Sequence, residues 1–262
     1  MFNKRHIVRT IAATVSILAL SFTAACGSGQ STASNSTDSD DITQQTYKPG
    51  KLTIATGQPA YEPWVMNDKP ESGEGYEAAV AYAVADKLGF KKSDVVWTRT
   101  AFDTAIAPGA KDWDFNIQQF GITDERKKAV DFSSSYYNDS QSVVVKKDSK
   151  FANATKVSDL KDATVGVMVG TLAYDYAKAN IKDDIQTFND DAALAQALDA
   201  GQIDALVTST VECVYMVQSE QVKDAKVLGR LPDSEDKSGM GIVLPKDSKL
   251  TAAVTKAVDL SL

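Results

Sequence analysis

The chain has 262 residues, of which 28 are basic and 35 acidic, for a formal net charge of −7. An acidic chain of this kind repels the phosphate backbone, which argues against nucleic acid as a partner. The single histidine is His6. The chain after its N-terminal segment therefore has no histidine for catalysis or as a metal ligand.

The N-terminus predicts an export signal. Three basic residues begin the chain, and residues 10–25 are uncharged and rich in apolar side chains. This stretch is shorter than the ~20 apolar residues that span a membrane. Two alanines precede Cys26, and the segment resembles the lipobox of bacterial lipoproteins, in which the cysteine is lipidated. Plain secretion with cleavage before Cys26 is the alternative.

A polar segment follows the signal. Residues 27–41 consist almost entirely of Gly, Ser, Thr, Gln, Asn and Asp, so we expect 27–47 to be a disordered tether. The signal segment, 1–26, holds three basic and no acidic residues, so the rest of the chain has 25 basic against 35 acidic residues and a net charge of −10. With Cys26 lipidated, Cys213 has no disulfide partner within the chain and is expected to be a buried, inert thiol.

Two runs of alternating strands and helices make up the rest of the chain, which predicts an α/β fold with helices on both faces of a sheet. In the first run we expect strands at 51–56, 94–97 and 115–117, and helices at 76–88, 102–107 and after Thr123. In the second run we expect strands at 141–146, 164–169, 185–188, 203–207 and 240–244, and helices at 172–179, 192–198, 211–218 and from 249 to the end.

The segment 114–133 carries the most informative pattern. A short apolar strand runs into two glutamines and a glycine, and Thr123 then precedes two acidic residues and Arg126. Thr123 is a good N-cap, and a strand end beside a forked cation is a suitable receptor for a small carboxylate. An ordinary strand-to-helix turn with a surface arginine is the alternative interpretation.

The same segment resembles the "ITDER…DFS…YY" signature of the family 3 extracellular solute-binding proteins, the amino-acid receptors of ABC importers. It matches at 122–126, 131–133 and 136–137, and the resemblance extends over nearly all of 51–262. It implies a two-lobed, periplasmic-binding-protein-like fold of type II with a ligand cleft between the lobes. Lobe one would comprise 48–138 plus 240–262, and lobe two 140–238. Family members continue past the last helix with a turn and a Trp-bearing helix, whereas this sequence stops at Leu262.

The resemblance also implies the residues of lobe one that bind the ligand. Arg126 is implied to grip the ligand carboxylate, and Gln119, Phe120 and Gly121 to line the site beside it. The family usually has Ser or Thr where this chain has Gly121. Tyr61 and Phe102 resemble the aromatic lid, although large apolar side chains are also common in cores.

In lobe two, Gly170, Thr171 and Leu172 resemble the family's Gly-Thr turn, which completes the carboxylate site. A simple N-cap is the alternative role for Thr171. Ser209 stands where the family has an Asp that pairs with the ligand's α-ammonium. A hydroxyl cannot supply that charge, so Glu212 or Glu62 is the candidate substitute.

We therefore interpret the chain as a monomeric, non-enzymatic receptor, lipid-anchored on the extracytoplasmic face of the cell membrane. It would need no cofactor or metal and would deliver a polar amino acid to permease and ATPase partners. The run 176–182 resembles glutamine-binding members, which favours a glutamine-like ligand. The alternatives are a small carboxylate without an α-ammonium, a sensor or orphan lipoprotein without a transporter, and a dehydratase-like enzyme of the same fold.

Overall fold

The structure, a computed structural model, describes residues 41–262. The expected signal segment, Cys26 and the first part of the expected tether lie outside these residues. Within residues 41–262, no helix is long and apolar enough to cross a membrane.

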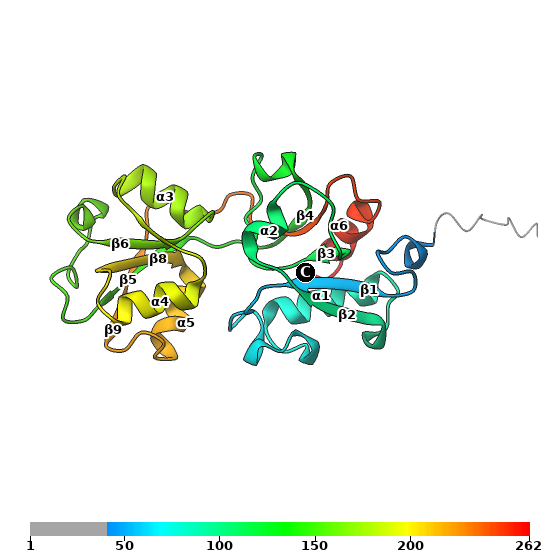
Figure 1. Ribbon diagram of the computed structural model, residues 1–262, viewed down its shortest axis with the longest axis horizontal. Helices are drawn as coiled ribbons and strands as arrows, with labels where there is room; N and C mark the ends of the chain where they lie inside the picture. Colours follow the sequence, from blue (N-terminus) through cyan, green and yellow to red (C-terminus); the bar gives the residue numbers. More distant parts are fainter. Residues whose placement is uncertain (1–40) are drawn as a thin grey trace, which may run out of the picture. The chain divides into compact units, whose positions relative to one another are not determined.

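Ten strands and six α-helices are present in the described residues (Figure 1). The strands are β1 (Leu52–Thr56), β2 (Val95–Arg99), β3 (Phe115–Asn116), β4 (Val130–Tyr137), β5 (Gln141–Lys146), β6 (Val165–Met168), β7 (Gln186–Phe188), β8 (Ala205–Ser209), β9 (Ala225–Arg230) and β10 (Met240–Pro245). The α-helices are α1 (Tyr76–Lys87), α2 (Phe102–Ile106), α3 (Leu172–Asn180), α4 (Asp191–Asp199), α5 (Thr210–Gln218) and α6 (Thr251–Asp259). Short 3-10 helices are η1 (Ile42–Gln44), η2 (Met66–Asp68), η3 (Pro70–Ser72), η4 (Lys92–Asp94), η5 (Arg126–Lys128) and η6 (Val157–Leu160).

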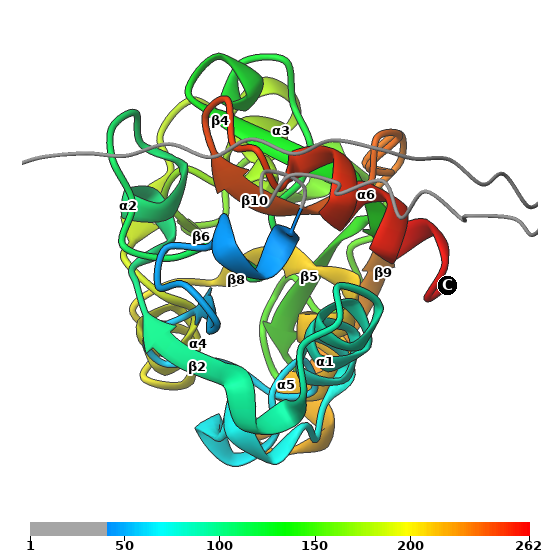
Figure 2. The same ribbon diagram turned by 90° about the vertical axis from the view of Figure 1, so that its right-hand side faces the viewer.

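The first sheet has the strand order β2-β1-β3-β10-β4. β1 is parallel to β2 and β3, whereas β10 is antiparallel to β3 and β4. All five residues of β1 are buried, as expected for a parallel strand covered on both faces. Apolar residues of α1 and α6 share one core with Leu52 and Ile54, and α6 lies along β4 (Figure 2). A smaller core around Ala55 includes Ala105 of α2.

The second sheet has the strand order β7-β6-β8-β5-β9. β6 is parallel to β7 and β8, and β5 is antiparallel to β8 and β9. One core contains apolar residues of α3, and a separate core contains those of α4 and α5. Cys213 belongs to the latter core and is fully buried, as expected.

The chain passes between the two sheets twice, from β4 to β5 and from β9 to β10. The part of the chain that contains the first sheet is called lobe one, and the part that contains the second sheet is called lobe two. Residues 138–140 and 231–239 are called the connectors. The backbone N–H of Asp236 donates to the carbonyl oxygen of Asp139 over 2.9 Å, so the connectors are joined to each other. The two-lobed α/β fold is thereby confirmed, while the precise lobe boundaries stay a prediction.

The helix expected after Thr123 is absent. The Thr123 hydroxyl does accept from the backbone N–H of Arg126 at 3.1 Å, as an N-cap would. Only η5 forms, however, because β4 begins at Val130 and the chain must extend to pair with β10. The pattern of apolar alternation did not predict β4, because serines interrupt it, or β9, because its residues are largely half-exposed or exposed.

Gly75, at the start of α1, allows the close approach of two chain segments. Its φ is +100°, and an added Cβ would lie 2.7 Å from the Trp64 carbonyl carbon and 2.8 Å from the Val65 Cα. Gly89, just after the same helix, has a φ of +87° but open space around the Cβ position. Both glycines therefore have a positive φ, and they differ in packing.

Gly75→Ala is expected to lower the free energy of unfolding by roughly 1–3 kcal/mol more than Gly89→Ala, the typical cost of overpacking against backbone. Both variants place an alanine at a positive φ, and Gly75→Ala adds the collision with the Trp64 backbone. Thermal and urea unfolding followed by circular dichroism would measure it. Equal destabilisation of both variants would contradict the packing role.

Candidate functional site

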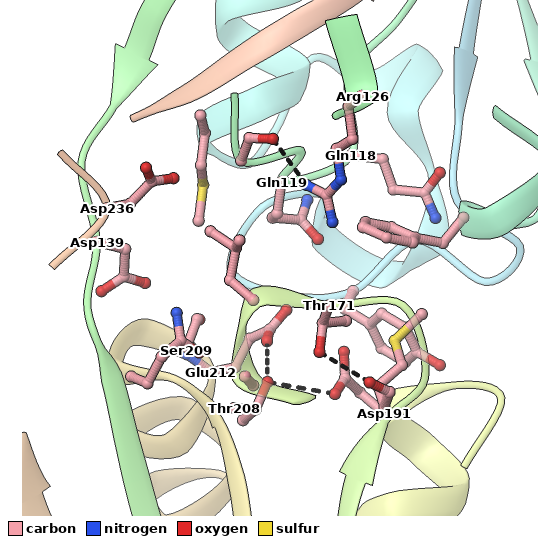
Figure 3. Close-up of a pocket in the computed structure, with 18 residues that line it drawn as sticks. Gln118, Gln119, Arg126, Asp139, Thr171, Asp191, Thr208, Ser209, Glu212 and Asp236 are labelled. Atoms are coloured by element: carbon pink, nitrogen blue, oxygen red, sulfur yellow. Dashed lines mark hydrogen bonds between the residues drawn. The ribbon is translucent and has the colours of Figure 1, made fainter. Parts of the chain in front are cut away.

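A cavity of about 70 Å³ lies between the two lobes. This is several times the volume that one water needs, so the cavity suits a small ligand. Its walls come from strand ends and helix starts of both lobes and from both connectors (Figure 3). The lining residues are Tyr61, Phe102, Gln118, Gln119, Gly121, Arg126, Asp139, Gln141, Met168, Thr171, Leu172, Ala173, Asp191, Thr208, Ser209, Glu212, Asp236 and Met240.

Arg126 of lobe one extends into this cavity (Figure 3). Its Nη1 donates to the Gly121 carbonyl oxygen at 2.7 Å, and its Nη2 donates to the Gly170 carbonyl oxygen of lobe two at 2.8 Å. The guanidinium carbon lies 5.4 Å from the centre of the Phe102 ring. Burial lowers the pKa of Arg126, but a guanidinium stays charged in proteins. Because it has five N–H groups, these two bonds leave donors for a ligand carboxylate.

Gln119 is held in place by a buried acid. Its backbone is left-handed, with a φ of +50°. The Glu77 carboxyl, fully buried at the start of α1, accepts from the Gln119 backbone N–H at 2.7 Å and also bonds the Gln119 amide and the Tyr136 hydroxyl. Burial raises the pKa of Glu77 to about 7, against the hydrogen bonds that lower it. This network fixes the strand end from which the cavity wall is built.

The aromatic residues divide between cavity and core. Tyr61 and Phe102 line the cavity, whereas Phe120 is fully buried beneath it and stacks on Phe102 at 4.7 Å between ring centres. The Tyr61 hydroxyl accepts from the backbone N–H of Ala192 in lobe two at 3.3 Å. Burial raises the pKa of Tyr61.

The turn before α3 has its own hydrogen bonds. The Thr171 hydroxyl accepts from the backbone N–H of Tyr174 at 3.2 Å and donates to the Met168 carbonyl oxygen at 2.8 Å, so it caps α3 while lining the cavity. Gly170 contributes its carbonyl oxygen to Arg126 rather than lining the cavity. Leu172 lies against Gly121, where an added Cβ would come 2.5 Å from the leucine Cδ1.

Two buried acids stand at the lobe-two side of the cavity, on α4 and α5. The Thr208 hydroxyl lies 2.8 Å from Glu212 Oε2 and 3.4 Å from Asp191 Oδ1. Burial raises the pKa of Asp191 to about 6. Burial, followed by the neighbouring charge of Asp191, also raises the pKa of Glu212.

Two further acids come from the connectors. The Asp139 carboxylate accepts from the backbone N–H of Ser140 at 2.7 Å, and a hydrogen bond to Ser209 lowers its pKa against the stronger effect of burial, which raises it. Asp236 Oδ1 accepts from the backbone N–H of Gly239 at 3.0 Å. Asp236 Oδ2 is buried and has no hydrogen-bond partner. Burial raises the pKa of Asp236, and the charge of Arg126 opposes this.

Glu62 lies outside the cavity. Its carboxylate accepts from the backbone N–H of Asn67 at 2.8 Å and from the hydroxyl of Tyr215 on α5, which links the two lobes at the surface. Of the two acids expected to substitute at Ser209, only Glu212 lines the cavity. Ser209 itself caps α5, accepting from the Glu212 backbone N–H at 3.2 Å.

Half of the residues that line the cavity were not predicted from the sequence to do so. These are Gln118, Asp139, Gln141, Met168, Ala173, Asp191, Thr208, Asp236 and Met240. The lobe bounds implied by the resemblance place Asp139 at the first crossing and Asp236 close to the second, which was a signal for these two acids. Asp191 lies just before the expected helix 192–198 and was given no role. Within the described residues, no group of three or more His, Cys, Asp or Glu side chains is placed to hold a metal ion.

Comparison with known proteins agrees with this architecture. An L-arginine-binding protein of Pseudomonas aeruginosa is 28% identical over 228 residues, covering 81% of this chain and 82% of the relative. A glutamine-binding protein of Geobacillus stearothermophilus is 32% identical over 225 residues, covering 78% and 82%. The structure of the arginine-, lysine-, histidine-binding protein ArtJ of Geobacillus stearothermophilus superposes with a TM-score of 0.69 at 25% identity, covering 80% of this chain and 88% of that one.

The model of the bacterial extracellular solute-binding proteins, family 3, matches residues 52–259. Proteins of this family are extracytoplasmic, bind amino acids and work with ABC permeases. The expected resemblance is confirmed by this match, and the chain belongs to family 3 of the bacterial extracellular solute-binding proteins as an amino-acid-binding protein of an ABC transporter.

Proposed function

We propose that the chain captures one polar amino acid in the cavity between its lobes and delivers it to the membrane permease of an importer. The observation that carries the proposal is the charge arrangement of the cavity, where Arg126 of lobe one faces carboxylates of lobe two and the connectors. A small molecule that carries both a carboxylate and a cation fits this arrangement. The relatives named for arginine and glutamine support an amino acid as that molecule.

Arg126 binds the α-carboxylate in this proposal. It is the one cation among the described residues that line the cavity, and it is desolvated there. The planar fork of a guanidinium pairs with a carboxylate through two parallel hydrogen bonds. A ligand carboxylate at this position would also lie close to the Gly170–Leu172 turn, whose carbonyl already bonds Arg126.

The connector acids bind the α-ammonium. Ser209 offers only a hydroxyl, but that hydroxyl bonds Asp139, whose carboxylate lies in the same cavity. Asp236 Oδ2 is a buried acceptor without a donor, and a buried polar atom of this kind is destabilising until it is paired. An ammonium beside Asp236 supplies the missing donor and the missing positive charge.

We further propose that Cys26 carries the lipid anchor, as its sequence context suggests, and that the receptor works as a monomer at the outer face of the membrane. Cys26 lies outside the described residues, so the support for the anchor comes from the sequence alone.

Arg126→Ala is expected to weaken binding of L-arginine or L-glutamine, whichever the parent binds more tightly, by ~2–5 kcal/mol, or roughly thirty- to several-thousand-fold. Arg126→Lys should recover only part of this loss, because an ammonium lacks the bidentate fork. Titration calorimetry measures both, with Arg230→Ala as a control that removes an exposed arginine. An Arg126→Ala affinity within threefold of the parent would refute the carboxylate role.

Asp236→Asn is expected to remove most of the preference for an amino acid over its deaminated analogue, because the variant has lost the charge that pairs with the α-ammonium. Loss of one partner of a desolvated charge pair weakens binding by about 2 kcal/mol or more. The matched control is Glu62→Gln, which removes an acid outside the cavity and should preserve the preference. If Glu62→Gln removes the preference and Asp236→Asn does not, the assignment is wrong.

Cys26→Ser is expected to release the protein from cell membranes into the soluble fraction, because two acyl chains on this cysteine would provide a stable anchor. Fractionation of cells with immunodetection measures the partition, and Ser28→Ala serves as a neighbouring control that should stay anchored. Membrane retention of Cys26→Ser would mean that another attachment holds the protein, and release of the parent itself would favour plain secretion.

A further inference from the structure

Asp191 and Glu212 share the Thr208 hydroxyl as a hydrogen-bond donor, and Ser209 also bonds the Glu212 carboxyl. Both acids are 7% exposed, and both face the Thr208 hydroxyl, with oxygen–oxygen distances of 3.4 Å from Asp191 and 2.8 Å from Glu212. A hydroxyl has one proton and can donate it to only one acceptor. If both acids are ionised, one of these buried carboxylates therefore lacks a donor from Thr208.

The groups that face this pair are mostly negative or neutral. Asp190 precedes Asp191 on α4, Asp139 approaches Glu212 from the connector, and both charges raise the pKa of their neighbour. From lobe one, Tyr61 reaches the start of α4 as an acceptor of the Ala192 N–H. Arg126 is the cation among the described lining residues, and its guanidinium donates to the backbone carbonyls of Gly121 and Gly170.

Ionisation of both buried carboxylates without a paired cation is unfavourable, because repulsion adds to the desolvation of each. The pair must hold a proton in the free protein at moderately acidic pH. The pKa of Asp191, raised to about 6, agrees with this geometric argument.

We propose that the Asp191–Glu212 pair binds a second cationic group on the side chain of the ligand, and that the shared proton leaves for solvent when this group arrives. The proposal rests on the function proposed above, in which Arg126 and the connector acids take up the α-carboxylate and the α-ammonium. It names the ligand as an amino acid with a side-chain amine or guanidinium. A neutral side chain such as that of glutamine can accept and donate hydrogen bonds here but cannot replace a proton.

Matched ligand pairs test the charge directly. Arginine and citrulline have nearly the same shape and differ in side-chain charge, as do lysine and norleucine with a larger change in polarity. At about pH 8 the cationic member of at least one pair should bind at least tenfold more tightly than its neutral partner. The preference should shrink by up to tenfold for each pH unit below about 6, because a proton then competes with the cation for the pair.

A second measurement needs no variant. Calorimetry of the cationic ligand near pH 6 in two buffers with different ionisation enthalpies should report protons released on binding, whereas the neutral partner should release none. In Asp191→Asn and Glu212→Gln the preference should fall to within threefold, and Glu220→Gln, an exposed acid just beyond α5, should retain it. Thermal unfolding of each variant verifies that it is folded.

The results separate this inference from the proposed function. Neutral ligands binding as tightly as their cationic partners in both pairs, with binding still lost in Arg126→Ala, would overturn the second cationic subsite and leave the amino-acid receptor intact. Absence of proton release on binding of the tighter cationic ligand would also overturn it. If no amino acid binds the parent at all, both proposals fail together.

Discussion

The desolvated guanidinium of Arg126 is the interaction on which the cavity depends. It bonds the Gly121 carbonyl of its own lobe and the Gly170 carbonyl of the other, so it links the lobes while it lines the space between them. Removing a cation from water is unfavourable unless negative or polar partners replace the water. Carbonyl oxygens replace part of it here. In the proposed function a ligand carboxylate completes the replacement, which couples recognition of that carboxylate to the contact between lobes.

Behind the cavity wall, a second buried charged group, Glu77, is also held by hydrogen bonds. Gln119 adopts a left-handed backbone that few residues other than glycine favour, and Glu77 compensates by accepting both its backbone and side-chain N–H groups. The Glu77 carboxyl, which does not line the cavity, therefore fixes the strand end that does. Because burial raises the pKa of Glu77 to about 7, the protonation of this carboxyl changes near neutral pH, and with it the acceptor oxygens that it offers to Gln119.

Sequence periodicity predicted most strands and helices because the apolar residues of strands such as β1 and helices such as α1 are buried continuously or on one face. It failed for β4, whose serines interrupt the pattern, and for η5, where pairing with β10 overrides a local helix signal. Arg126 and Thr171 were identified from local motifs. Asp139 and Asp236 were not, because their place in the cavity results from two chain crossings that no local pattern encodes.

The placement of the carboxylates also determines how a ligand can change the lobe equilibrium. A ligand shifts that equilibrium only as far as it binds the closed form better than the open form. Asp191 and Glu212 belong to lobe two, and Asp139 and Asp236 to connectors that are bonded to each other. Closing the lobes around these acids brings like charges into a smaller, drier space, which opposes closure. A ligand that carries compensating positive charge removes this opposition. In the proposed function, the acids thus select the ligand by allowing the lobes to close around it, in addition to contacting it directly.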